Sequence, residues 1–226
     1  MRTAKALADG GSATRVVDEA RALCAELLIV RCPAADLYAA QTLEEQGCRL
    51  MDVLVYYARD LRLPIPEESD GIRIRPANDG EEEPVAEIAR AAFAGYFGHY
   101  HADRRLDPKK ADEVYVSWAR RSCLSRDVAA EVLVADDGGL LRGFLTLRRN
   151  SAEESEIVLN AVAPAAQRRG IYRALMINAL RWSVAEGAAR AVVSTQLTNV
   201  AVQKAWTRLG FEPHASYLTF HRWFDE

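Results

Sequence analysis

Apolar residues recur along the chain with two periods, and each period predicts a different kind of element. Short apolar runs, many of them β-branched, predict strands at 27–32, 49–59, 72–75, 131–135, 140–149, 156–162 and 190–195, and one or two closing strands within 211–224. Apolar positions three and four apart predict helices over 13–26, 35–46, 81–93, 108–122, 171–187 and 199–209. The mixture of strands and helices predicts an α/β fold.

A break in this pattern divides the chain into two unequal parts. The segment 63–71 combines two prolines, three acidic residues and a glycine, which is typical of a linker. We therefore expect residues 1–70 to form a smaller N-terminal α/β lobe and residues 71–226 to form the main domain. Val30 precedes Gly47 by 17 positions (47 − 30), and Val193 precedes Gly210 by the same number (210 − 193). A partial internal repeat would explain this spacing, and two ordinary α/β units of equal length would give it as well.

The composition adds limits to this picture. Half of the 226 residues are hydrophobic, which is enough for a sizeable core. The net charge of −3 gives no sign of a nucleic-acid partner. The four cysteines form no close pair and have no histidine at metal-ligand spacing, so we expect free thiols and no metal site. Without a signal peptide or an apolar run of about 20 residues, we expect a cytoplasmic protein that does not bind membranes.

The most distinctive segment joins the strand that ends at Val162 to the helix that follows it. It reads Gln167-Arg168-Arg169-Gly170-Ile171-Tyr172-Arg173. The start of a helix has unpaired N–H groups and a partial positive charge, so anions bind there readily. A glycine lets the backbone approach a ligand, and arginines add charge. The segment predicts a phosphate site, although a solvated arginine-rich turn would read the same way.

With this turn, the order of the elements resembles the GNAT superfamily of acetyl-CoA-dependent N-acetyltransferases. Residues 72–224 carry the likeness, through the signature Gln/Arg-x-x-Gly-x-Gly/Ala at 167–172, through Asn199, and through the ending Leu209-Gly210-Phe211. Tyr172 departs from the signature, because a small residue is usual there. The resemblance implies an α+β sandwich whose mixed central sheet splays open, with acetyl-CoA as the cofactor.

The resemblance also implies where the cofactor lies. Its pantetheine arm would follow the strand that ends at Val162, whose main-chain N–H would stabilise the oxyanion of the attacked carbonyl. Asn199 and Trp206 of the next helix would reach the cofactor, although an asparagine there could simply cap its helix and a tryptophan could simply fill the core. The expected cofactor contacts are Ala161, Val162, Gln167, Arg168, Arg169, Gly170, Ile171, Tyr172, Arg173, Asn199 and Trp206.

Four residues are candidates for proton transfer, two as the base and two as the acid. Glu156 stands 11 positions before the signature glutamine (167 − 156), which is the spacing of the general base in the histone acetyltransferases of this superfamily; an exposed strand-end carboxylate is the alternative. His101 is a rival base, because the usual pKa of histidine is about 6.5. Trp206 stands where many GNAT enzymes have an acidic tyrosine, and an indole cannot supply a proton. We therefore expect Tyr172, Tyr217 or a water to protonate the leaving thiolate.

The segment 93–105 is rich in aromatic and basic side chains and lies where GNAT domains usually bind the acceptor. With the N-terminal lobe and the helix that follows, it resembles the branch containing dTDP-fucosamine acetyltransferase, which acetylates the amine of a nucleotide-linked deoxy sugar. We expect substrate contacts from Tyr96, His99, Tyr100, His101, Arg104 and Trp118. A solvated loop with two core aromatics is the alternative.

Together these features predict an N-acetyltransferase in which the amine of a small acceptor, first of all a nucleotide-linked amino sugar, attacks the thioester directly. An aminoglycoside, a polyamine or a protein N-terminus would fit the same cofactor site. Trp206 leaves open a third function, a module that binds an acyl-CoA without catalysis. The closing strand could pair with the sheet of a second copy, which would give a homodimer.

Overall fold

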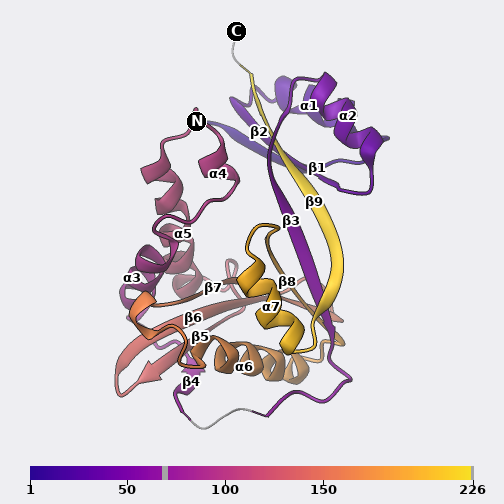
Figure 1. Ribbon diagram of the computed structural model, residues 1–226. Coiled ribbons are helices and arrows are strands. Elements are labelled where there is room, and N and C mark those ends of the chain that lie inside the picture. The colour runs from indigo at the N-terminus through magenta and orange to yellow at the C-terminus, as the bar shows by residue number, and fades with distance from the viewer. Residues whose placement is uncertain (68–70, 225–226) are drawn as a thin grey trace.

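The computed structural model describes residues 1–67 and 71–224, which form one mixed nine-stranded sheet with helices on both faces (Figure 1). Residues 1–67, which we call the lobe after the expected division, contain β1 (Thr3–Leu7), α1 (Ala13–Ala22), β2 (Leu27–Pro33), α2 (Leu37–Glu45) and β3 (Arg49–Asp60), and we call residues 71–224 the main domain. The main domain contains β4 (Arg73–Pro76), α3 (Glu82–Phe93), α4 (His99–Ala102), α5 (Pro108–Leu124), β5 (Glu131–Asp137), β6 (Leu140–Arg149), β7 (Glu154–Val162), a 3-10 turn (Pro164–Ala166), α6 (Ile171–Ala185), β8 (Arg190–Gln196), α7 (Val200–Arg208) and β9 (Glu212–Trp223).

The α/β class and the mixed, splayed sheet are confirmed, and three short elements lie outside the predicted ones: β1, α4 and the 3-10 turn. β1 escaped prediction because it is a short edge strand with no fully buried residue. α4 is a single helical turn inside the aromatic loop. The first helix ends at Ala22 rather than near residue 26, because Cys24 adopts a left-handed backbone with φ of +52°.

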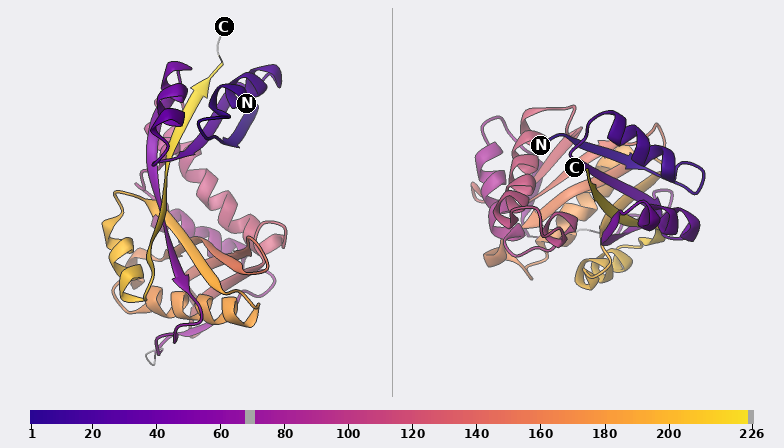
Figure 2. Two further views of the ribbon diagram at one scale, coloured as in Figure 1. Left: turned by 90° about the vertical axis from the view of Figure 1, so that its right-hand side faces the viewer. Right: turned by 90° about the horizontal axis from the view of Figure 1, so that it is seen from above.

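The strands follow the order β1-β2-β9-β3-β8-β7-β6-β5-β4. β3 therefore lies inside the sheet, between β9 and β8, and the lobe and the main domain share this sheet. β3 and β9 run side by side from the lobe into the main domain, as Figures 1 and 2 show. β9 pairs with β2 over residues 217–223 and with β3 over 212–221, so its middle part has no free edge for a second copy, and a homodimer stays a prediction.

Three elements of the lobe recur in the main domain at a constant spacing of 163 residues. This spacing separates the first residues of β2 and β8 (190 − 27), of α2 and α7 (200 − 37), and of β3 and β9 (212 − 49). The third strand of each set crosses to the other set, because β3 pairs with β8 and β9 pairs with β2. Each set thus completes its part of the sheet with a strand from the other.

Two arginines fasten this exchange. Arg59 of β3 donates to the carbonyl oxygen of Leu209, at the end of α7, and Arg222 of β9 donates to that of Gly47, at the end of α2. Gly47 and Gly210 have φ of +72° and +79°, and a Cβ on either would collide with the opposite arginine. Each glycine is therefore required both by its backbone conformation and by the close approach of the other set's arginine.

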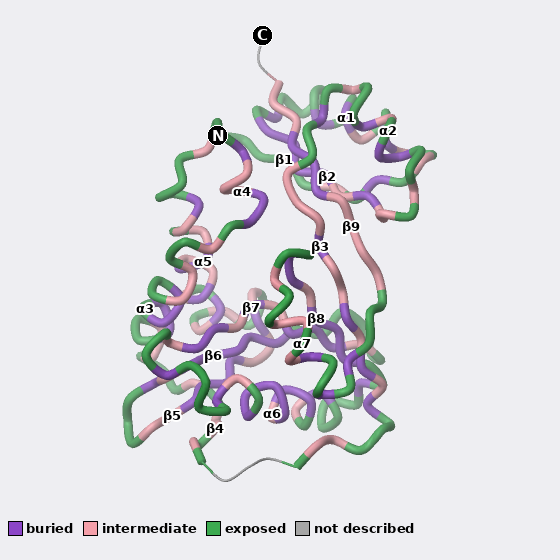
Figure 3. The backbone as a smooth tube through the Cα atoms, viewed as in Figure 1, coloured by how far each residue is buried: buried purple, intermediate pink, exposed green. Residues whose placement is uncertain are grey.

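The apolar core has three parts that follow the helices. One lies between α6 and β5–β8, a second lies between α3, α5 and the opposite face of β5–β7, and a third lies under α1 and α2 in the lobe. Figure 3 shows the buried backbone concentrated along β6–β8 and α6. This packing holds β7, β8 and the start of α6 firmly in place.

Candidate active site

A fork opens between β7 and β8. The two strands pair in parallel only from Glu154–Ile157 with Arg190–Val193, and β7 then continues for five residues (162 − 157) and β8 for three (196 − 193). A bulge in β7 accompanies the separation, because two residues, Val158 and Leu159, stand opposite Thr146 of β6. The Thr146 hydroxyl accepts the Leu159 N–H at 3.0 Å, which satisfies this N–H at the bulge.

The main chain at the end of β7 presents polar groups to the open side of this fork. Ala163 donates its N–H to the carbonyl oxygen of Arg142 on β6 at 2.8 Å. Successive N–H groups along a strand point to opposite sides, so the N–H of Val162 points away from β6 and toward the fork. The Val162 carbonyl, on the same side, accepts from the Gln167 amide at 3.4 Å.

The first turn of α6 lies just beyond the fork with its amides uncapped. Gly170 and Arg168 both have left-handed backbones, with φ of +79° and +63°, which curves the chain into a concave turn of amides. No side chain caps α6 within the described residues, and Ala174 is the first residue of the helix whose N–H bonds back, to Gly170. A Cβ on Gly170 would meet no other atom within 4 Å. The turn has the geometry of an anion site.

Exposed arginines surround this turn. Arg169 approaches Asp137 at 3.5 Å, with both side chains substantially exposed. Arg168 and Arg173 are exposed and form no ion pair with any described residue. Two guanidinium groups thus have no internal partner where the resemblance expects phosphates.

Trp206 and Tyr172 form a hydrogen-bonded pair between α7 and α6. The Trp206 indole is 1% exposed and donates to the Tyr172 hydroxyl at 2.8 Å. Burial raises the pKa of Tyr172, and the bond from Trp206 opposes this shift. Trp206 stands where many GNAT enzymes have a tyrosine. The hydroxyl of Tyr172, from the neighbouring helix, lies beside its indole.

Asn199 occupies the N-cap position of α7, but its side chain makes no capping bond. It donates instead to the Thr195 hydroxyl at 3.1 Å, at the end of β8. The capping alternative is therefore wrong for the side chain, which lies beside the fork instead.

Glu156 is a buried and paired carboxylate, 5% exposed, so the alternative of an exposed strand-end acid is wrong. Arg148 donates to its Oε2 through Nε at 3.0 Å and through Nη2 at 2.6 Å. The neighbouring Ser155 bonds to Ser183 of α6, so Glu156 faces the opposite side of the sheet, toward α3 and α5. Burial, and secondarily this carboxylate, raises the pKa of Tyr56 on β3.

The aromatic loop around α4 is fastened to β9 by a buried network. His99 Nδ1 lies 2.9 Å from His221 Nε2, and His221 Nδ1 lies 2.8 Å from Asp103 Oδ2, which also accepts from Trp223 at 2.8 Å. Burial lowers the pKa of His99 to about 3 and also lowers that of His221. His99 is thus a neutral packing residue at pH 7, and the role expected of it in binding substrate stays a prediction.

The other loop residues divide between packing and solvent. His101 bonds through Nε2 to Asp112 at 2.9 Å and accepts through Nδ1 from the Gly98 N–H at 3.4 Å, so both ring nitrogens are engaged. The Tyr100 ring lies 3.9 Å from that of His99, and its hydroxyl accepts from Lys5 at 3.4 Å. Arg104 is exposed, and Trp118 packs against the core between α3 and α5.

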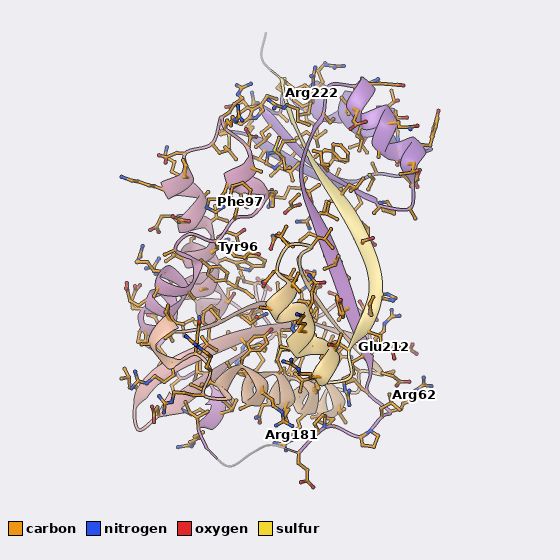
Figure 4. All side chains as sticks on the ribbon, in the orientation of Figure 1. Arg62, Tyr96, Phe97, Arg181, Glu212 and Arg222 are labelled. Atoms are coloured by element: carbon orange, nitrogen blue, oxygen red, sulfur yellow. The ribbon has the colours of Figure 1, made fainter. Side chains whose placement is uncertain are left out.

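Tyr96 is the loop residue that reaches the fork. Its hydroxyl hydrogen-bonds to Thr195 at the end of β8, and burial raises its pKa to about 12. Its ring packs edge-on against Phe93 and Tyr115. Figure 4 shows Tyr96 and Phe97 on the segment between α3 and α4, facing the strands of the opposite half of the molecule.

Several other features lie apart from the fork. A cavity of about 300 Å³ lies between α3 and α5, with Arg90, Phe93 and Glu113 in its lining, and it includes no residue of β7, β8 or the turn. Within 1–67 and 71–224, no group of three histidine, cysteine or acidic side chains could hold a metal ion, and the four cysteines are free. In the same residues no helix has the length and apolarity needed to span a bilayer.

Two curated proteins are similar to this chain over most of its length. The spore coat polysaccharide biosynthesis protein SpsD of Bacillus subtilis is 26% identical over 205 residues, which are 88% of this chain and 67% of SpsD. The mycothiol acetyltransferase of Streptomyces avermitilis is 28% identical over 163 residues, which are 71% of this chain and 49% of that enzyme. The chain thus spans about two thirds and about half of these relatives.

Solved structures share the fold at low sequence identity. A GCN5-related N-acetyltransferase from Sphaerobacter thermophilus has a TM-score of 0.63 at 18% identity, over 94% of this chain and 68% of its own. A tandem GNAT protein from the clavulanic acid biosynthesis pathway also has a TM-score of 0.63 at 18% identity, over 92% and 67%. The model of the acetyltransferase (GNAT) family matches residues 83–211, more than half of the chain (211 − 83 + 1 = 129 of 226). This chain therefore belongs to the acetyltransferase (GNAT) family.

Proposed function

We propose that the protein transfers an acetyl group from acetyl-CoA to the primary amine of a small acceptor, and that this acceptor is an amino sugar carried on a nucleotide. The observation that supports the reaction best is the open fork between β7 and β8, with the uncapped start of α6 beside it. The choice of a sugar is supported by the likeness to SpsD, whose name places it in polysaccharide biosynthesis. The free cysteines suit a reducing, cytoplasmic location, which is part of the same proposal.

The residues around the fork fit this cofactor. The amides from Arg168 to Arg173 would hold the diphosphate, and the unpaired guanidinium groups of these two residues would add charge to it. The edge of β7 at Ala161 and Val162, which no longer pairs with β8, would pair with the pantetheine amides. Asn199 and Trp206 would form the opposite wall.

Acetyl-CoA supplies an acetyl group activated as a thioester. Glu156 takes the proton that the amine loses when its nitrogen bonds to the acetyl carbon; its Oε2 is held by Arg148, which leaves Oε1 for this role. The N–H of Val162 donates to the carbonyl oxygen as negative charge develops there. Tyr172, held by the Trp206 indole, protonates the thiolate sulfur when the carbon–sulfur bond breaks.

The proposed cofactor site and the proposed proton transfers would also suit an acceptor amine that is not on a sugar. A module that binds an acyl-CoA without catalysis is supported by one observation, Trp206 in place of a tyrosine. The nearby Tyr172 hydroxyl weakens that support. His101 is the weaker base, since both its nitrogens are already bonded.

The variant Gly170→Asp tests the cofactor site, and Gly187→Asp is a matched control. Both glycines have φ of +79° and open space where a Cβ would lie, but they lie at opposite ends of α6. An aspartate at 170 would face the diphosphate, so we expect the affinity for acetyl-CoA in calorimetry to fall at least about 100-fold, while Gly187→Asp binds as wild type.

Equal affinity in both folded variants would refute the cofactor site. Incubating wild type with acetyl-CoA and a panel of amino sugars, polyamines and aminoglycosides, while free thiol is followed, then tests the reaction. Binding of coenzyme A without thiol release from any acceptor would favour the non-catalytic module.

A further inference from the structure

Two buried oxygen atoms near the mouth of the fork have no hydrogen-bond partner in the described structure. They are Oδ1 of Asp52, on β3, and Oε1 of Gln196, the last residue of β8. Gln196 is 8% exposed, and its only link to Asp52 is a long contact of 3.5 Å from Nε2 to Oδ2. Leaving a buried acceptor unpaired is costly, so a site with two of them is suited to a ligand that brings donors.

These atoms lie where an acceptor must approach. Gln196 pairs with Leu54, so Asp52, two residues earlier on β3, projects from the same face of the sheet. Tyr96 bonds to Thr195, the neighbour of Gln196, and the Asp52 carboxylate contributes to the raised pKa of Tyr96. The unpaired oxygens thus lie between the fork and the aromatic loop.

Arg31 of β2 supplies a positive charge on the same face. Thr219 of β9 stands opposite both Arg31 and Asp52, so the three residues form one row across the sheet. Two strand spacings separate Arg31 from Asp52, about 10 Å between Cα atoms. Arg31 donates through Nε to the Thr219 hydroxyl at 3.3 Å, and it forms no ion pair with any residue in 1–67 or 71–224. Its half-buried guanidinium is therefore available to an anion.

We infer that the N-terminal lobe recognises the acceptor. Asp52 and Gln196 accept hydrogen bonds from the amine and hydroxyl groups of an amino sugar, and Arg31 binds a phosphate on the same molecule. The two charged groups project from the same face of the sheet, so a single phosphorylated amino sugar lying on that face would contact both. This inference rests on the proposed function and adds the residues that select the acceptor: Arg31 on β2 binds its phosphate and Asp52 on β3 binds its sugar, and both strands lie outside the region that the family model matches.

The test compares Asp52→Asn and Arg31→Gln with two controls on exposed or half-exposed groups of the lobe, Asp60→Asn and Arg49→Gln. Acceptors are glucosamine, glucosamine 1-phosphate and a nucleotide-linked amino sugar. We expect Asp52→Asn to raise KM for all three by roughly 10- to 100-fold. Arg31→Gln should lower kcat/KM by a similar factor for the two phosphorylated acceptors and leave glucosamine unchanged. The controls should match wild type.

The decrease in kcat/KM caused by Arg31→Gln is compared between the two phosphorylated acceptors. Equal decreases mean that Arg31 contacts only the phosphate that both acceptors share. An Arg31→Gln variant that affects all three acceptors equally would overturn the phosphate assignment. Asp52 has one buried and unpaired carboxylate oxygen, Oδ1, so Asp52→Asn should keep or raise the melting temperature. A lower melting temperature with unchanged KM would instead mean that Asp52 is only structural.

Failure of the proposed function gives a different result. If wild type binds acetyl-CoA but acetylates none of the acceptors, calorimetry with glucosamine 1-phosphate in the presence of coenzyme A still tests the inference. Binding to wild type that is lost in both variants would support the acceptor site without the reaction. No binding to wild type would overturn it.

Discussion

Glu156, the proposed base, is almost fully buried and is held by two nitrogens of the Arg148 guanidinium. Both contacts go to a single oxygen, so the guanidinium orients the carboxylate and leaves its other oxygen unbonded. Arg148 thus acts on the proposed reaction by positioning Glu156.

The role of Glu156 leads to a prediction for the variant Glu156→Gln, with Glu154→Gln as the control. Both carboxylates lie on β7 and both are held by an arginine, Glu154 by Arg190 at 2.5 Å. Glutamine keeps the shape but accepts no proton, so kcat should fall about 10²- to 10⁴-fold at 156 while the affinity for acetyl-CoA stays constant. The control should keep its kcat. A normal kcat in Glu156→Gln would remove this residue as the base.

Among the elements, α4 is the one whose attachment depends on uncharged histidines. It packs through His99 onto His221 of β9, while Lys5 and Arg31 of the lobe contribute to the lowered pKa of His99. A proton on this imidazole would place a buried positive charge beside other positive groups. Protonation of His99 would therefore weaken the contact between the aromatic loop and β9.

The pH dependence of stability follows from this contact. The pKa of His99 is about 3 when folded and 6.5 when free, so between these values the unfolded chain binds one more proton than the folded chain. The contribution of His99 to the free energy of unfolding is therefore fully present above pH 6.5. Below that pH it falls by about 1.4 kcal/mol per pH unit, the value for one proton.

Urea unfolding from pH 7 to pH 4 measures this slope. His99→Gln should reduce this slope by the amount that corresponds to about one proton. The same substitution at His214, which is exposed, should leave the slope unchanged. Identical slopes in wild type and His99→Gln would show that His99 does not titrate in this way.

In the whole molecule, the exchange of β3 and β9 makes the lobe and the main domain depend on each other for folding. β3 is paired on both sides by strands of the main domain, and β9 closes the sheet of the lobe. Separating the two parts would expose both edges of β3. It would also break the arginine contacts at Leu209 and Gly47, since each of them joins the two parts.

A cut in the linker tests this dependence. We predict that a protease site inserted between Glu67 and Gly71 can be cleaved without releasing the lobe, so that gel filtration gives one peak while a denaturing gel gives two bands. A main domain expressed without residues 1–67 should not unfold cooperatively. Separation of the two fragments after cleavage, each with its own unfolding transition, would contradict this prediction.

The sequence predicted those features that depend on residues close together in the chain. Most strands and helices followed from the spacing of apolar residues, and the turn at Gly170 followed from its glycine and the helix start. Contacts between distant segments escaped it: the crossing of β3, the bond from Trp206 to Tyr172, and the row that contains Arg31 and Asp52. These depend on which strands become neighbours, and a single sequence carries no direct signal for that. The common origin of the two sets of elements stays a prediction.

The crossed strands also limit how such an enzyme could be redesigned. An engineer who wished to change acceptor preference by grafting the first sixty residues from a relative would install a foreign β3 against a resident β8, and would leave the resident β9 in a foreign sheet. Residues 212–223 would have to travel with the graft. Natural lineages meet the same barrier, so selectivity and folding in this architecture should change together, through paired substitutions on two segments that are far apart in the gene.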